Sequence, residues 1–130
     1  MHGPQECLGN MILLCASQLY EEPRLSLGFA NCLINQYPDI PQRELVQDCA
    51  LTHGIDFGKI NACISEEGYA LDLLRKSVQR STDAKITTSC TIRLEQQIWC
   101  VTDSEKDCND GKNLDALLED IHTAHEELDP

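Results

Sequence analysis

Apolar residues in the first part of the chain recur at intervals of three and four positions, which is the spacing of one face of a helix. Over residues 6–20 the apolar positions follow the i, i+3, i+4, i+7 pattern of an amphipathic helix. Pro23 follows and is expected to end that helix. The apolar positions that define it are Leu8, Met11, Ile12, Cys15, Ala16 and Leu19.

The same spacing predicts four more helices, over residues 27–37, 42–53, 57–64 and about 66–81. Ser26 and Asp56 are suitable N-caps for the first and third of these. Gly54 is suited to the position just after the second. The side chains expected to face inward are Phe29, Cys32, Leu33, Tyr37, Leu45, Val46, Cys49, Ala50, Phe57, Ile60, Cys63, Tyr69, Leu73, Leu74 and Val78.

The period changes to two after residue 85, which indicates β-strand. Residues 86–94 and 97–101 are predicted as two strands joined by a hairpin near 94–97, followed by a polar loop over 102–112. Asn113 can cap a last helix, 114–127. We therefore predict an α+β fold that is mostly helical. The side chains expected to face inward on the last helix are Leu114, Leu117, Leu118, Ile121 and Ala124.

Net charge restricts the partners of the chain. Its 22 acidic and 10 basic residues give −12, and no basic cluster offsets this excess. Phosphate backbones and anionic membrane surfaces would be repelled, so we expect neither a nucleic-acid nor a membrane partner. The longest apolar run, residues 11–16, is far too short to span a bilayer. There is no phosphate-binding glycine loop, and we expect no cofactor.

Eight cysteines in 130 residues are more than a cytosolic protein usually carries. No Cys-x2-Cys pair occurs, which argues against a zinc ribbon and a thioredoxin-type redox pair. The wide spacing suits disulfides between elements and a protein of the secretory pathway, although no signal peptide is visible in this chain. All eight cysteines are predicted to form disulfides: Cys7, Cys15, Cys32, Cys49, Cys63, Cys90, Cys100 and Cys108.

Two pairings remain open for Cys100. If the hairpin turn centres on Glu95, Cys90 and Cys100 face each other across the two strands, and a cross-strand disulfide would be reducible. The alternative joins Cys100 to Cys108 and closes the polar loop. The sequence by itself does not choose between them.

Two groups of polar residues resemble metal sites in part. His122 and His125 have an i, i+3 spacing on a helix, but a zinc site would need Cys or carboxylate partners from elsewhere, so a solvated face is expected. The loop residues do not fit a calcium-binding EF-hand because Cys108 stands where that loop needs glycine, and the terminal Glu is absent. We expect His53 to be a surface or capping residue. The acidic and amide residues of the loop are Asp103, Glu105, Asp107, Asn109 and Asp110.

The most specific signal is the series of six fixed positions at the N-terminus. It resembles the hallmark motif of the gamma-interferon-inducible lysosomal thiol reductase (GILT) family, Cys-Gln-His-Gly-x2-Glu-Cys-x2-Asn-x4-Cys. Met1 stands where that motif has Gln, and its first Cys has no counterpart, so we expect the chain to begin inside the motif. The matching residues are His2, Gly3, Glu6, Cys7, Asn10 and Cys15.

This resemblance implies a fold and a domain organisation. GILT proteins are similar to a thioredoxin fold with an inserted helical region. Residues 1–130 would then form a single, N-terminally incomplete domain, with the helical insertion at 1–84 and the hairpin and closing helix at 85–130. Cys32, Cys49 and Cys63 also recur at intervals similar to those of the family.

The resemblance also implies the reduction of disulfides in protein substrates, in a lysosomal, vacuolar or extracellular setting. The Cys-x2-Cys of the family lies upstream of the motif, so we expect no catalytic pair in this chain and no activity from it alone. Cys90 is a weak catalytic candidate, near the place where thioredoxin folds usually have a cis-proline. The alternative is a non-catalytic, disulfide-stabilised helical module that binds another protein.

Overall fold

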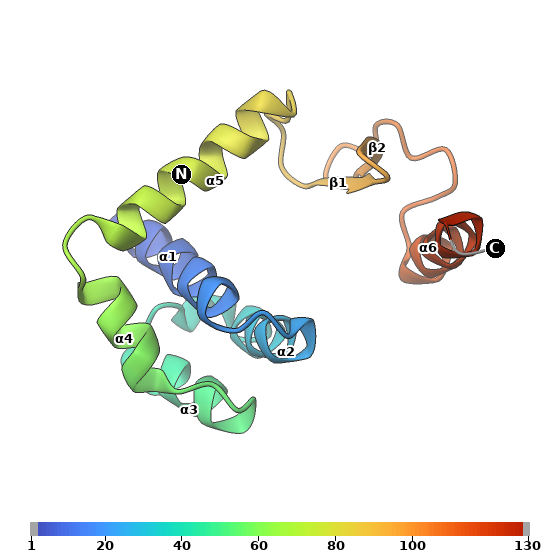
Figure 1. The fold of residues 1–130 in the computed structure, drawn as a ribbon. Coiled ribbons are helices and arrows are strands. Elements are labelled where there is room, and N and C mark those ends of the chain that lie inside the picture. The colour runs from blue at the N-terminus through green and yellow to red at the C-terminus, as the bar shows by residue number, and fades with distance from the viewer. Residues whose placement is uncertain (1–2, 129–130) are drawn as a thin grey trace. The chain divides into compact units, whose positions relative to one another are not determined.

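The computed structural model describes residues 3–128, which contain six α-helices and one two-stranded antiparallel sheet (Figure 1). The predicted class, α+β and mostly helical, is confirmed. Within the described range, no helix combines the length and apolar character needed to cross a bilayer. The helices are α1 (Pro4–Leu19), α2 (Pro23–Ile34), α3 (Arg43–Thr52), α4 (Phe57–Ser65), α5 (Tyr69–Asp83) and α6 (Leu114–Leu128), with a short 3-10 turn at Tyr37–Asp39.

The chain divides into two compact units. We call Met1–Arg80 the helical unit and Ser81–Pro130 the hairpin unit. In the helical unit α1 contacts α2 and α4, and α3 also contacts both α2 and α4. One apolar cluster fills the space between these helices, and Phe29, Leu33 and Ile60 at its centre are fully buried. The periodicity of the sequence therefore identified most of the buried face of this unit, but the prediction is wrong for Leu19, Tyr37 and Val78, which are 43%, 72% and 53% exposed.

Two helix starts differ from the prediction. α2 begins at Pro23 rather than after Ser26, because the side chain of Glu22 accepts a hydrogen bond from the Arg24 backbone N–H and proline is well suited to the first helical position. α5 begins at Tyr69 rather than 66. Gly68 has φ +78°, a left-handed conformation that interrupts the helical path after α4.

The two predicted caps around residue 55 are confirmed. Gly54 has φ +72°, and the Ile55 N–H donates to the Ala50 carbonyl at 2.9 Å, which closes α3 with a Schellman-type turn. Asp56 then caps α4 by accepting from the Lys59 N–H at 3.2 Å. Together these caps fix the angle at which α4 leaves α3.

The hairpin unit contains β1 (Thr91–Leu94) and β2 (Gln97–Val101). The prediction of a strand from residue 86 is wrong. Ile86 donates its N–H to the Ser81 carbonyl, so the chain there still follows the end of α5. Glu95 and Gln96 form the two-residue turn with φ of +54° and +64°, as a type I′ turn requires.

The last helix is placed as predicted, but its burial is not. Asn113 Oδ1 accepts from the Ala116 N–H at 2.8 Å and caps α6. Leu114, Leu118 and Ile121 were expected to face inward, yet they are 68%, 53% and 43% exposed. The hairpin beside α6 offers only two strands, which is too little apolar surface to cover the whole face of the helix.

Candidate functional site

Three disulfides join six of the eight cysteines. Two of them brace the helical unit: Cys15 of α1 is bonded to Cys63 of α4, and Cys32 of α2 to Cys49 of α3. Cys15, Cys49 and Cys63 are buried, so little of either bond is open to an attacking thiolate. These four cysteines therefore act as cross-links between helices.

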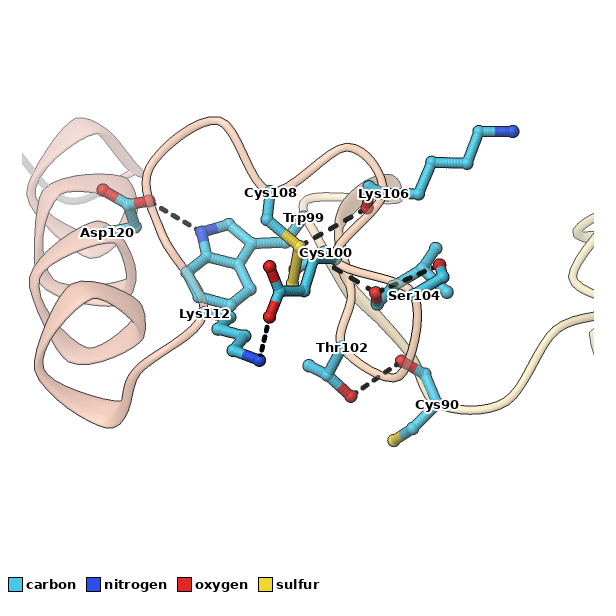
Figure 2. The surroundings of a disulfide bond; sticks show 11 residues. Cys90, Trp99, Cys100, Thr102, Ser104, Lys106, Cys108, Lys112 and Asp120 are labelled. Carbon is cyan, nitrogen blue, oxygen red and sulfur yellow. Dashed lines mark hydrogen bonds and ion pairs between the residues drawn. A yellow bond between two sulfur atoms is a disulfide. The ribbon is translucent and has the colours of Figure 1, made fainter.

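The third disulfide, Cys100–Cys108, closes the polar loop of the hairpin unit (Figure 2). Cys100 on β2 is fully buried, whereas Cys108 is partly exposed. The same loop is tied to β2 by a hydrogen bond from the Val101 N–H to the Lys106 carbonyl at 2.9 Å. Of the two pairings left open by the sequence, the loop-closing one is the one observed.

The prediction that all eight cysteines form disulfides is wrong for Cys7 and Cys90, neither of which belongs to a disulfide. The cross-strand alternative fails because of the register. A bulge between Ile92 and Arg93 and the two-residue turn place Cys100 opposite Ile92. Cys90 instead lies beside Thr102, whose N–H and Oγ1 both donate to the Cys90 carbonyl, at 2.9 and 3.2 Å.

Cys90 is an exposed thiol at the start of the hairpin, and Cys7 is half-buried on α1. The peptide bond between Ser89 and Cys90 is cis. The two thiols belong to different units of the chain. Neither is part of a Cys-x2-Cys pair.

The predicted motif residues lie at the start of α1. Gly3 precedes the helix with φ +132°, and Glu6 lies in the first turn, where the helix dipole favours a negative charge. Asn10 is half-buried on the same helix, and Cys15 forms the disulfide to α4. His2 lies outside the described residues.

Sequence reasoning missed two glycines that allow close contacts in the helical unit. A Cβ built on Gly9 of α1 would lie 2.8 Å from Cγ2 of Ile40, and one on Gly28 of α2 would lie 2.7 Å from Nδ1 of His53. Glycines inside helices are the available signal, since they reduce helix stability and often mark close packing. His53 is the C-cap of α3, in agreement with the prediction of a capping role.

The acidic surface of the hairpin unit is held together by hydrogen bonds. Trp99 Nε1 donates to Asp120 Oδ2 at 2.7 Å and links β2 to α6. A hydrogen bond with Asp120 raises the pKa of Asp110 above its ordinary value of 3.8, and the negative charge of Asp120 adds to this rise. The hydrogen bond with Lys112 lowers the pKa of Glu105, with help from the positive charge of Lys112.

These side chains do not form a metal centre. Among residues 3–128 there is no group of three or more His, Cys, Asp or Glu residues that could hold a metal ion. His122 Nε2 instead lies 3.2 Å from Glu126 Oε1, one helical turn along the exposed face of α6. What the described residues offer chemically is a set of disulfides that cross-link helices and one exposed thiol, that of Cys90.

Comparison with known proteins gives one match. Residues 1–53 match the family model described as gamma interferon inducible lysosomal thiol reductase (GILT). The matched segment contains the N-terminal motif and three of the four cysteines that form the disulfides of the helical unit. No curated protein and no solved structure matches the chain.

Proposed function

We propose, from the membership of the GILT family that the match over residues 1–53 supports, that this chain is the disulfide-braced scaffold of a thiol–disulfide oxidoreductase that reduces protein disulfides. We further propose that these 130 residues by themselves do not turn over substrate. The observation that carries the proposal is that the motif lies at the start of α1, the helix that the Cys15–Cys63 disulfide joins to α4.

The structural role of the motif supports this reading. Its last residue, Cys15, is fully buried and bonded to Cys63, 48 residues further along the chain. A bond that closes so long a segment stabilises the fold strongly, because it limits the conformations of the unfolded chain. Cys15 therefore holds α1 in place and is not exposed to substrate.

The distribution of the remaining thiols supports the absence of turnover. Reduction of a disulfide by a thiol pair needs one thiolate to attack and a second thiol nearby to resolve the mixed disulfide. Cys90 is exposed, but it is not in a Cys-x2-Cys. A single thiol has no partner in such a pair to resolve its mixed disulfide, so release of Cys90 would depend on an external thiol.

An insulin-reduction assay at acid pH, with a small thiol as the final reductant, tests the proposal. We expect no rate above that of the small thiol alone, and no change in the Cys90→Ser variant. Turnover by the chain that disappears in Cys90→Ser would overturn the proposed inactivity and make Cys90 the nucleophile. Mass spectrometry of the reaction should show at most one covalent adduct, on Cys90.

The setting that we propose is an oxidising compartment of the secretory or endolysosomal pathway. Three disulfides in a chain of this length support it, because such bonds persist where the medium is oxidising. The proposed substrates are proteins that carry disulfides. Fractionation of cells that make the tagged protein, followed by alkylation of free thiols, would show whether the cysteines are oxidised in that compartment.

A second candidate is a non-catalytic module that binds another protein. It is favoured by the two-stranded sheet, both of whose edges lack a neighbouring strand in the described residues, and by the exposed leucines of α6. Size-exclusion chromatography with light scattering separates the cases. A monomer with one cooperative melting transition favours the self-sufficient binding module, whereas aggregation favours the oxidoreductase scaffold, whose two-stranded sheet would need further strands to pair with.

A further inference from the structure

The helical unit contains an apolar pocket of about 220 Å³ between α1, α3 and α4. Its inner wall is formed by Ile12, Val46 and Ile60, which are 3%, 2% and 0% exposed. The lining includes only two side chains with polar ends, those of Arg43 and Asn61. The pocket is thus a hydrocarbon surface with a small polar portion.

Arg43 is held at this pocket by an aromatic contact. Its guanidinium carbon lies 5.3 Å from the centre of the Phe57 ring, a cation–π arrangement between the start of α3 and the start of α4. Among residues 3–128 no carboxylate forms an ion pair with Arg43. In a chain of net charge −12, a guanidinium without a carboxylate partner beside an apolar pocket leaves its hydrogen-bond donors available to an anion.

We propose that this pocket binds a small apolar carboxylate, such as a short fatty acid or an arylalkanoate. The hydrocarbon part would cover Ile12, Val46 and Ile60, and the carboxylate would accept hydrogen bonds from Arg43. A guanidinium matches a carboxylate in charge and in the geometry of its paired N–H groups. Asn61 offers an amide N–H as a further donor. This inference does not depend on the proposed thiol chemistry.

The size of the pocket limits the ligand. Sites for drug-sized molecules occupy roughly 300–1,000 Å³, so this pocket suits a smaller molecule of about ten non-hydrogen atoms. Ligands of that size bind through few contacts, and we expect a dissociation constant on the order of 1 mM for heptanoate. The carboxylate should improve affinity about tenfold over the matching alcohol, as hydrogen bonds to charged groups do.

The first experiment is a titration of the full chain at neutral pH, followed by two-dimensional NMR of its backbone amides. Heptanoate is the probe, heptan-1-ol tests the apolar part without the charge, and acetate tests the charge without the apolar part. We expect heptanoate to shift the amides around Arg43 and Phe57 at concentrations where heptan-1-ol and acetate do not. Equal binding of heptanoate and heptan-1-ol, or shifts confined to other surfaces, would overturn the proposal.

Variants then test the two parts of the pocket separately. Arg43→Gln should weaken heptanoate binding about tenfold and leave heptan-1-ol binding unchanged, whereas Arg43→Lys should retain part of the affinity. Arg24→Gln on α2, a cation that does not line the pocket, is the matched control. Ile64→Phe should obstruct the pocket and weaken both probes. Unchanged heptanoate affinity in a folded Arg43→Gln protein would contradict the assigned role of Arg43.

Discussion

The helical unit and the hairpin unit are stabilised by different means. The helical unit has a continuous core in which thirteen buried side chains form one cluster. In the hairpin unit only Cys100 and Val101 reach that degree of burial among the described residues. Hydrophobic burial stabilises a fold roughly in proportion to the area removed from water, so the helical unit gains far more from packing.

The disulfides follow the same division. In the helical unit they connect helices that are 48 and 17 residues apart and that already pack against each other. In the hairpin unit the single bond closes a loop of eight residues and stands in for a core. One cysteine-rich chain thus uses disulfides to reinforce a hydrophobic core in one region and to compensate for a small core in another.

The largest expected effect comes from removing the longest cross-link. The double variant Cys15→Ala/Cys63→Ala should lose about 4 kcal/mol of unfolding free energy from chain entropy alone. Urea unfolding followed by far-ultraviolet circular dichroism measures it, with Cys32→Ala/Cys49→Ala as the matched variant at about 3 kcal/mol. A larger loss in the shorter-loop variant would show that packing of the sulfur atoms matters more than loop length.

The second effect concerns the core of the helical unit. Leu33→Ala removes a fully buried side chain and should cost about 3 kcal/mol, since it leaves a cavity. Leu51→Ala is the matched control, because Leu51 is 83% exposed and its truncation should change stability by no more than about 0.5 kcal/mol. Equal effects of the two changes in urea unfolding would refute the proposed position of the core.

The third effect sharpens the contrast by acting on the hairpin unit. Loss of the eight-residue loop closure in Cys100→Ala/Cys108→Ala corresponds to about 2.5 kcal/mol. Trp99 is the only tryptophan, so its fluorescence reports on this unit, while circular dichroism reports mainly on the helices. In the Cys100→Ala/Cys108→Ala variant we expect the fluorescence of Trp99 to change at a lower urea concentration than the circular dichroism signal of the helices. Simultaneous loss of both signals would mean that the two units unfold together.

The smallest effect is a pH dependence around Trp99. The hydrogen bond with Asp120 raises the pKa of Asp110 in the folded protein, so the contribution of this pair is fully present below the ordinary value of 3.8 and is lost as pH rises through the folded pKa. Trp99 fluorescence should therefore change as pH rises through the folded pKa of Asp110. Asp110→Asn should remove this titration, and Asp103→Asn should leave it in place.

The pKa of Glu105 is shifted in the opposite direction to that of Asp110. The hydrogen bond with Lys112 lowers its pKa, so its contribution is present at higher pH and is lost as pH falls through the folded pKa. A titration of Trp99 that persists in Asp110→Asn and is removed instead by Lys112→Gln would assign the transition to Glu105.

Much of the helical unit was predictable because its periodicity reflects burial. The buried faces of α2, α3 and α4 were identified from the spacing of apolar residues alone. The caps at Gly54 and Asp56 were predictable because they depend on the local backbone chemistry of single residues. The start of α2 was misplaced because two local signals compete there. Glu22 followed by Pro23 forms a better helix start than Ser26.

The hairpin unit was less predictable because its register depends on contacts between strands. The hairpin near residues 94–97 was predicted, but the bulge after Ile92 is not visible in an alternating pattern. The bulge shifts the pairing so that Cys100 meets Ile92 and bonds to Cys108. The partial exposure of α6 could not be predicted either, because burial depends on how much surface the neighbouring elements provide.

The sequence by itself determined the class of fold, the positions of most helices and the N-terminal motif that resembles the GILT family. These properties depend on residue type and spacing along the chain. Only the tertiary structure decided which cysteines pair, that Cys90 stays exposed, and that Arg43 stacks on Phe57 beside an apolar pocket. These are contacts between segments far apart in sequence or dependent on strand register, and they exist only when the helices and strands have packed together.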